Sequence, residues 1–161
     1  MASPEQLPVP PDQTASQQPL VLVIEDEALI ALSVEQILTE AGYDVLVAFS
    51  GEEALGGEVP IERLAAVVSD IRLAYGIDGR SVLSKLRAMR PSLPAVMVTG
   101  FGQWIHEADL RGLGGPTARL TKPFAAEELI ACIGSVLTST DGRLNRRSSR
   151  GRAGDPDDPA R

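Results

Sequence analysis

The sequence is poor in cysteine, histidine and aromatic residues, and each shortage excludes a class of protein. A single cysteine, Cys132, excludes an internal disulfide framework and a cysteine metal cluster, and it suits a reducing compartment. The single histidine, His106, has no second histidine and no nearby cysteine with which to form a histidine- or cysteine-based metal site. Aromatic residues make up only 4% of the chain, so any core must be built from aliphatic side chains.

The chain also lacks an excess of positive charge and long apolar runs. Its formal charge of −7 argues against nucleic acid as the main partner, because neutralising phosphates requires a surplus of lysine and arginine. No stretch reaches the roughly 20 apolar residues of a membrane span, and residues 1–19 contain no apolar signal core. We therefore expect a cytoplasmic protein that binds neither DNA nor a membrane directly.

The two ends of the chain differ from its middle. Residues 1–19 are rich in proline and glutamine, and residues 139–161 are rich in glycine, serine and arginine. Neither segment has enough apolar surface to offset the entropy lost on ordering, so we predict a disordered arm and a disordered, arginine-rich tail. Residues 20–138 are predicted to form one folded domain.

Short apolar runs alternate with segments of helical periodicity throughout this middle region. The predicted strands are 20–25, 44–48, 65–70, 94–99 and 118–121. The predicted helices are 27–41, a short helix from Ser50, about 80–90, a glycine-rich helix within 102–116, and about 125–138. This alternation predicts an α/β fold, a doubly wound, flavodoxin-like parallel sheet of five strands in the order 2-1-3-4-5. Its crevice would lie between the carboxyl ends of strands 1 and 3.

Acidic residues follow those two strands. The first strand runs directly into Glu25, Asp26 and Glu27, and the third ends at Asp70. Carboxylates this close repel one another unless a cation lies between them. Mg2+ prefers oxygen ligands, accepts one or two carboxylates, and keeps its other positions for water and phosphate oxygens. The sequence therefore predicts a magnesium site at this edge.

The fourth and fifth strands bring two further groups to the same edge, Thr99 and Lys122. A hydroxyl, an ammonium, a metal and a carboxylate are what a phosphoryl group bound to that carboxylate would need, because its charge is spread over three oxygens. Asp70 is the best nucleophile among the acids, since it ends the central strand.

Four short segments resemble the receiver domain of two-component response regulators, a CheY-like family. They are "VLVIEDE", "VVSDIRL", "VTG" and "LTKPF", in this order and at these intervals, and the resemblance covers about residues 20–138. It implies that Asp70 accepts a phosphoryl group from a phosphohistidine on a sensor histidine kinase or a histidine phosphotransfer protein. The chain would then be a phosphoprotein that assists its own phosphorylation and dephosphorylation, not a separate enzyme.

The same resemblance implies a role for each neighbour of Asp70. Glu25, Asp26 and the backbone carbonyl of Arg72 would join Asp70 in holding Mg2+. Thr99 would bond a phosphoryl oxygen and move on activation. Lys122 would pair with the phosphoryl charge, and its bond to Pro123 would be cis.

The sequence departs from the receiver pattern at the residues that usually change position on activation. Arg119 stands three residues before the lysine, where receivers usually carry an aromatic residue. Phe101 follows Thr99-Gly100 directly, and Trp104 comes three residues later. The chain thus looks like a divergent receiver group in which "TG" is followed by Tyr or Phe. We predict that Thr99, Phe101 and Trp104 take part in switching.

Three readings of the function follow from these features. No apolar core follows residue 138, which favours a single-domain response regulator that signals through contacts with a downstream protein. For such a regulator, Leu29 and Leu32 widen the apolar stripe of helix 27–41, so we expect the first turns of this helix to dock a phosphohistidine-bearing helical bundle. The altered switch leaves open a receiver-like adaptor that works without phosphorylation. A flavodoxin-like nucleotide or flavin-binding protein is disfavoured, because the acids after the first strand would repel a phosphate.

Overall fold

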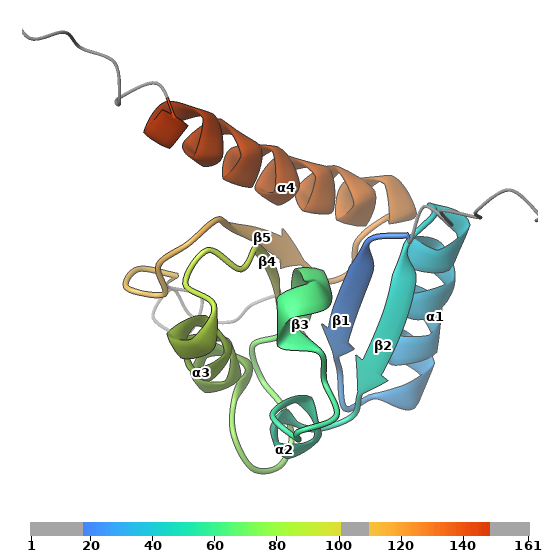
Figure 1. Ribbon diagram of the computed structural model, residues 1–161. Helices are drawn as coiled ribbons and strands as arrows, with labels where there is room; N and C mark the ends of the chain where they lie inside the picture. The colour runs from blue at the N-terminus through green and yellow to red at the C-terminus, as the bar shows by residue number, and fades with distance from the viewer. Residues whose placement is uncertain (1–17, 101–109, 149–161) are drawn as a thin grey trace, which may run out of the picture.

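The chain folds around a parallel sheet of five strands in the order β2-β1-β3-β4-β5, which confirms the predicted fold class (Figure 1). The computed structural model describes residues 18–100 and 110–148, with side chains described as far as residue 139. The strands are β1 Leu20–Ile24, β2 Asp44–Ala48, β3 Leu64–Asp70, β4 Ala95–Thr99 and β5 Thr117–Thr121. The helices are α1 Ala28–Glu40, α2 Gly51–Ala54, α3 Gly79–Met89 and α4 Ala126–Ser148, with a 3-10 turn, η1, at Ile61–Arg63.

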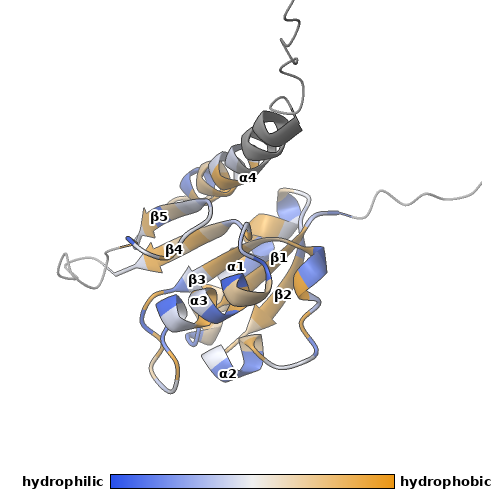
Figure 2. Cartoon of the chain, turned by 60° about the vertical axis from the view of Figure 1, so that its left-hand side comes forward, coloured by the Kyte–Doolittle hydropathy of each residue, from blue (hydrophilic) through white to orange (hydrophobic). Residues whose placement is uncertain are grey.

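Two apolar layers cover the two faces of the sheet. Along β1, Val21 and Val23 pack toward α1 and α4, whereas Leu22 and Ile24 pack toward α2 and α3. This alternation follows from the two-residue period of a strand, which sends successive side chains to opposite faces. Because both faces are covered, β1 is apolar throughout and β3 and β4 are apolar up to their last residues, and the strands are largely hydrophobic in colour in Figure 2.

Local capping explains where the two helices beside the site begin. The Ser50 hydroxyl accepts a hydrogen bond from the Glu53 backbone N–H at 3.1 Å, and this fixes the start of α2 as the sequence predicted. The Asp78 carboxylate accepts from the Ser81 N–H at 2.8 Å and fixes the start of α3. Both helices therefore begin next to the carboxyl ends of β2 and β3.

The end of the last helix was predicted wrongly. We expected it near residue 138, but α4 continues to Ser148. Residues 139–148 contain no proline, and the glycine at 142 alone costs only about 1 kcal/mol in a helix, which is too little to end it. The predicted disorder of residues 1–17 and 149–161 lies outside the described residues.

The glycine-rich helix predicted within 102–116 does not include the second half of that segment. Residues 110–116, which lead into β5, form turns and no helix. Glycines 112, 114 and 115 have positive φ angles, which a right-handed helix cannot contain. Residues 102–109 lie outside the described residues.

None of the helices that the structure describes is long and apolar enough to cross a membrane.

Candidate functional site

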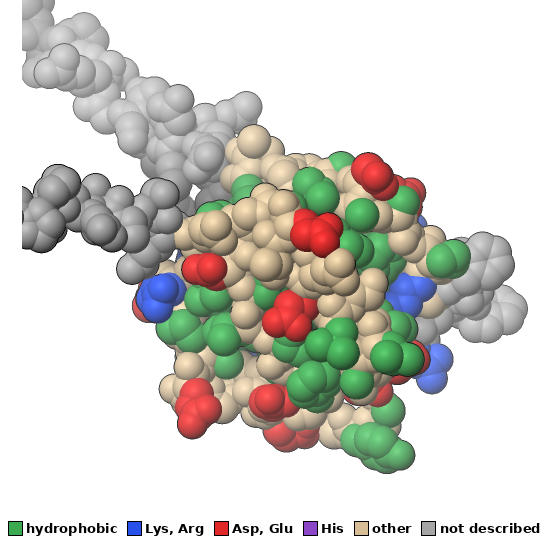
Figure 3. Space-filling model, turned by 90° about the vertical axis from the view of Figure 1, so that its right-hand side faces the viewer, with side chains coloured by type: hydrophobic (Ala, Val, Ile, Leu, Met, Phe, Trp, Pro, Cys, Tyr) green, Lys and Arg blue, Asp and Glu red, His purple; other side chains and the backbone are tan. Residues whose placement is uncertain are grey.

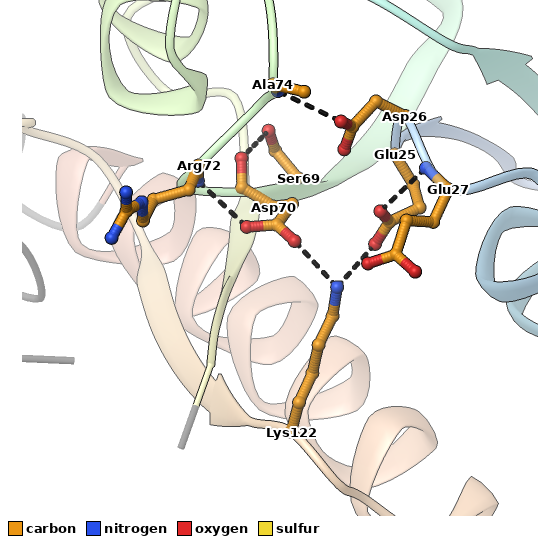
Figure 4. Close-up of polar contacts among 8 residues, drawn as sticks. All are labelled: Glu25, Asp26, Glu27, Ser69, Asp70, Arg72, Ala74 and Lys122. Atoms are coloured by element: carbon orange, nitrogen blue, oxygen red, sulfur yellow. Dashed lines mark hydrogen bonds and ion pairs between the residues drawn. The ribbon is translucent and has the colours of Figure 1, made fainter. Parts of the chain in front are cut away.

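The carboxyl ends of β1 and β3 lie side by side, as the sheet order requires. Ile24 of β1 is in register with Ser69 of β3, so the residues that follow them, Glu25 and Asp70, are neighbours at the edge of the sheet. Both side chains are largely buried: Glu25 is 4% exposed and Asp70 is 9% exposed. Two carboxylates are therefore held together away from most of the solvent (Figure 4).

Lys122 supplies the positive charge between these two acids. Its ammonium nitrogen lies 2.6 Å from Oδ2 of Asp70 and 2.7 Å from Oε2 of Glu25, and Figure 4 shows the side chain extending from below into the gap between them. Lys122 directly follows β5, and its backbone N–H donates to the Thr99 carbonyl at 2.7 Å. The Lys122–Pro123 peptide bond is cis, as the resemblance implied.

The electrostatic balance of this trio can be read from pKa directions. Burial raises the pKa of the Glu25 carboxyl above its ordinary value, and the nearby Asp70 charge raises it further. Hydrogen bonds from Lys122 and from the Glu27 N–H lower that pKa, as does the positive charge of Lys122, but they do not outweigh burial. Burial by itself lowers the pKa of the Lys122 ammonium, but the hydrogen bonds and charges of Asp70 and Glu25 outweigh it and raise that pKa. Lys122 is thus held firmly in its charged form.

The other two predicted metal ligands lie on the loop side of the site. Asp26 turns away from Lys122, and its Oδ2 accepts a hydrogen bond from the Ala74 N–H at 2.9 Å. The backbone N–H of Arg72 donates to Oδ1 of Asp70 at 2.8 Å, which places the Arg72 peptide beside the predicted acceptor. Asp70 therefore has one oxygen toward Lys122 and the other toward the loop (Figure 4).

The donor chemistry of the site suits a hard divalent cation, although the acids are not gathered into a cluster. Among residues 18–100 and 110–139, no three acidic, histidine or cysteine side chains are close enough to hold one ion together. Mg2+ does not need such a cage, because it is usually bound by one or two carboxylates with water and phosphate oxygens completing the octahedron. Asp26 and Asp70, with the backbone of the β3–α3 loop between them, offer oxygen donors of that kind.

The remaining predicted site residues have separate outcomes. Thr99 ends β4, is buried, and lies one residue beyond Val98, the register partner of Asp70. Arg119, at the usual place of the switch aromatic, is exposed on β5. Phe101 and Trp104 lie outside the described residues, so their switching role stays a prediction.

Some neighbours of the site were not anticipated from the sequence. The Ser69 hydroxyl donates to the Asp70 backbone carbonyl at 2.9 Å, and Gly79 lies against the same carbonyl. The Ala74 N–H, which bonds Asp26, carries no side-chain signal at all. Only Gly79 could have been singled out, as a glycine just before a predicted helix.

A five-stranded parallel sheet in this order, with acids after β1 and β3 and a lysine after β5, defines a CheY-like receiver domain. The response regulator receiver domain family matches residues 21–134, and the chain belongs to this family.

Known proteins with related sequences and structures agree with this assignment. The chain is 36% identical over 115 residues to the C4-dicarboxylate transport transcriptional regulatory protein DctD of Rhizobium meliloti, covering 71% of this chain and 24% of that protein. It resembles the crystal structure of a CheY-like receiver domain protein from Methanospirillum hungatei, with a TM-score of 0.68 and 26% identity over 78% of this chain and 98% of that one. It also resembles NtrX from Brucella abortus, with a TM-score of 0.70 and 30% identity over 84% of this chain and 30% of that one.

The sequence relatives are longer than this chain. It spans between a quarter and about half of the length of the curated relatives that it matches.

Proposed function

We propose that this chain is the phosphoacceptor of a two-component phosphorelay and that Asp70 receives the phosphoryl group from a phosphohistidine. One observation carries the proposal above the others: a buried carboxylate at the carboxyl end of the central strand lies 2.6 Å from a lysine ammonium. That pairing suits phosphoryl transfer, because the lysine can neutralise charge on the phosphoryl oxygens as they arrive at the carboxylate.

The transfer itself exchanges one bond to phosphorus for another. A carboxylate oxygen of Asp70 attacks the phosphorus, an O–P bond forms, and the P–N bond to the donor imidazole breaks. The electron pair of that bond returns to the imidazole nitrogen. The Lys122 ammonium then moves from pairing with the Asp70 carboxylate to pairing with the phosphoryl oxygens, and the Thr99 hydroxyl offers a hydrogen bond to one of them.

A bound Mg2+ would neutralise the phosphoryl oxygens further and would be held by Asp26, Asp70 and the Arg72 carbonyl. Glu25, 2.7 Å from Lys122, would help to orient the ammonium and to hold the cation's water shell. These assignments are supported by the family and by the oxygen donors at the site.

The exposed surface next to the site supports a helical protein as the phosphoryl donor. Leu29 is 83% exposed and Leu32 is 55% exposed, on the first two turns of α1, which begin just after Asp26. Figure 3, which faces the side where α1 lies in Figure 1, shows hydrophobic and acidic side chains intermixed on this surface. A sensor histidine kinase or a phosphotransfer protein with an apolar helical face would fit it, and signalling would continue to a downstream protein target.

The proposal is tested with a small acyl phosphate and Mg2+, followed by intact mass. The wild-type chain should gain one phosphoryl group, and Asp70→Asn should gain none. If a chelator prevents this increase in mass, the result would support a requirement for Mg2+. An unmodified wild-type mass, or equal modification of the Asn variant, would overturn the assignment of Asp70.

A receiver-like adaptor that works without phosphorylation remains the second candidate, since Arg119 replaces the switch aromatic on the exposed face of β5. The same mass measurement separates the two, because an adaptor would show no gain in the wild type.

A further inference from the structure

We propose that Glu52, on α2, is a positioning residue that holds the β3–α3 loop, residues 71–78, so that the loop presents its Arg72 carbonyl beside Asp70. This inference rests on the proposed function and adds to it a residue outside the acids and the lysine. In Figure 1, α2 lies beside the loop that leads from β3 to α3.

Direct contacts join Glu52 to the far half of this loop. Its Oε1 accepts a hydrogen bond from the Ile77 backbone N–H at 3.2 Å, although 25 residues separate them. The carboxylate also lies close to Gly76, where an added Cβ atom would stand 2.2 Å from Oε1. Gly76 has φ +76°, a conformation that other residues rarely adopt, so the loop bends sharply at the place where Glu52 holds it.

The backbone around this contact is packed with no spare room. A Cβ on Gly51, the residue before Glu52, would come within 2.7 Å of the Ile77 carbonyl oxygen. A Cβ on Gly79, where the loop enters α3, would come within 1.9 Å of the Asp70 carbonyl oxygen. The start of α2 therefore packs against the loop, and the end of the loop packs against Asp70, so close contacts connect Glu52 to the acceptor.

Two further carboxylates accept hydrogen bonds from this loop in the described structure, and both belong to the site itself. Asp70 accepts from the Arg72 N–H and Asp26 accepts from the Ala74 N–H. When a cation and a phosphoryl group enter, both of these acids face new partners. Glu52 lies outside that exchange, so it can keep the loop in place while Asp26 and Asp70 change partners.

The experiment compares Glu52→Ala with Glu52→Gln, which keeps an acceptor oxygen, and with Glu58→Ala, which removes an exposed carboxylate in the turn after α2. Three quantities are measured: Mg2+ affinity by calorimetry, amide exchange of residues 71–78 without metal, and the Mg2+ dependence of phosphorylation by an acyl phosphate. Because Glu52 is exposed, all three variants should fold, which circular dichroism checks.

Glu52→Ala should weaken Mg2+ binding and raise the half-saturating Mg2+ concentration by about three- to tenfold, which corresponds to the loss of one hydrogen bond. The Ile77 amide should exchange faster by a similar factor, and the rate at saturating Mg2+ should change by less than about twofold. Glu52→Gln and Glu58→Ala should behave like the wild type.

The proposal is overturned if Glu52→Ala leaves Mg2+ affinity unchanged, whether or not its loop exchanges faster, or if Glu58→Ala has the same effect. A wild type that takes up no phosphoryl group would overturn the proposed function instead. In that case Mg2+ affinity and amide exchange still decide whether Glu52 positions the loop.

Discussion

The Lys122 ammonium nitrogen lies 2.6 Å from Oδ2 of Asp70, and 52 residues of sequence separate the two side chains. The contact exists because β5 and β3 end at the same edge of the sheet. With Glu25 on its other side, Lys122 holds together the ends of three strands, so its removal has consequences for stability as well as for phosphoryl transfer.

Replacing Lys122 with methionine should lower the free energy of unfolding by about 1–3 kcal/mol at neutral pH. The variant leaves Glu25 and Asp70 largely buried and facing each other without a cation. Urea denaturation measures the loss, and Lys85→Met, at an exposed position on α3, is the matched control. Equal stabilities of the two variants would contradict this role of Lys122.

The contribution of Lys122 to the free energy of unfolding should depend on pH in the alkaline range. Its pKa is raised in the folded chain above the ordinary value of 10.5, so its stabilisation is complete below pH 10.5 and is lost as the pH rises through the higher folded pKa. The stability difference between the wild type and Lys122→Met should therefore shrink above that pH. Taking the difference cancels groups common to both chains, including Arg87, whose pKa burial lowers to about 10. A constant difference up to about pH 12 would contradict the raised pKa.

Two glycine-to-alanine substitutions should act in opposite directions. Gly79→Ala should destabilise the fold by about 1–3 kcal/mol or more, because the new Cβ would overlap the Asp70 carbonyl oxygen. Gly134→Ala, within α4 and with no atom within 4 Å of the new Cβ, should stabilise it by about 0.5–1 kcal/mol. Thermal denaturation of both variants tests the pair, and a stabilised Gly79→Ala would show that the close approach is wrong.

Arg87 should be far more important for stability than an exposed arginine. It is 5% exposed, and its guanidinium donates to the carbonyls of Leu93 at 2.8 Å and Pro116 at 2.7 Å. It also donates to the Leu113 carbonyl, so it ties α3 to the loop before β5. Arg87→Met should lower the free energy of unfolding by about 3 kcal/mol, because several buried carbonyls lose their hydrogen-bond donor.

The control for Arg87 is Arg119→Met, at an exposed position on β5, which should change the free energy of unfolding by less than about 0.5 kcal/mol. Chemical denaturation of both variants gives the comparison. A loss for Arg87→Met no greater than that of the control would mean that these carbonyls are satisfied in another way.

Leu29→Glu should slow phosphoryl transfer from a phosphohistidine protein by about tenfold, because the exposed leucine would no longer pack against the donor. Phosphorylation by a small acyl phosphate should not change, since Leu29 is 83% exposed and the polar contacts of Asp70 are made by Lys122 and Arg72. Met89→Glu, on α3 and 54% exposed, is the control. Equal rates for Leu29→Glu and the wild type with the protein donor would contradict docking on α1.

Most of the architecture could be predicted from the sequence because its signals are local. The five strands and the helices around them follow from apolar periodicity and capping residues such as Ser50 and Asp78. The end of α4 could not be predicted in this way, since residues 139–148 lack both an apolar stripe and a strong stop signal. The helix predicted within 102–116 does not extend into residues 110–116, where positive-φ glycines form turns.

The sequence argument predicted that Glu25, Asp70 and Lys122 lie at one edge of the sheet, but not how their side chains pair. Placing Asp70 and Lys122 at one edge needs only the strand order. The sequence argument placed a divalent ion among all the acids, whereas the structure pairs Glu25 with Lys122 and turns Asp26 toward the Ala74 amide. Which partner each acid binds depends on side-chain rotamers and on the positions of backbone amides, and neither can be inferred from the sequence. The same holds for Glu52, whose partner is a peptide N–H.

The position of Lys122 also separates the stability of the fold from the binding of a metal ion. The counter-charge for Asp70 and Glu25 is part of the chain itself, so the electrostatic repulsion between them is already reduced before any ion arrives from solution. If Mg2+ is required as proposed, chelation should stop phosphorylation, while the chain stays folded and loses only the stabilisation that Mg2+ binding adds. Mg2+ would then act mainly on phosphorylation, and a chain without it would keep its fold and could be phosphorylated once the ion returned.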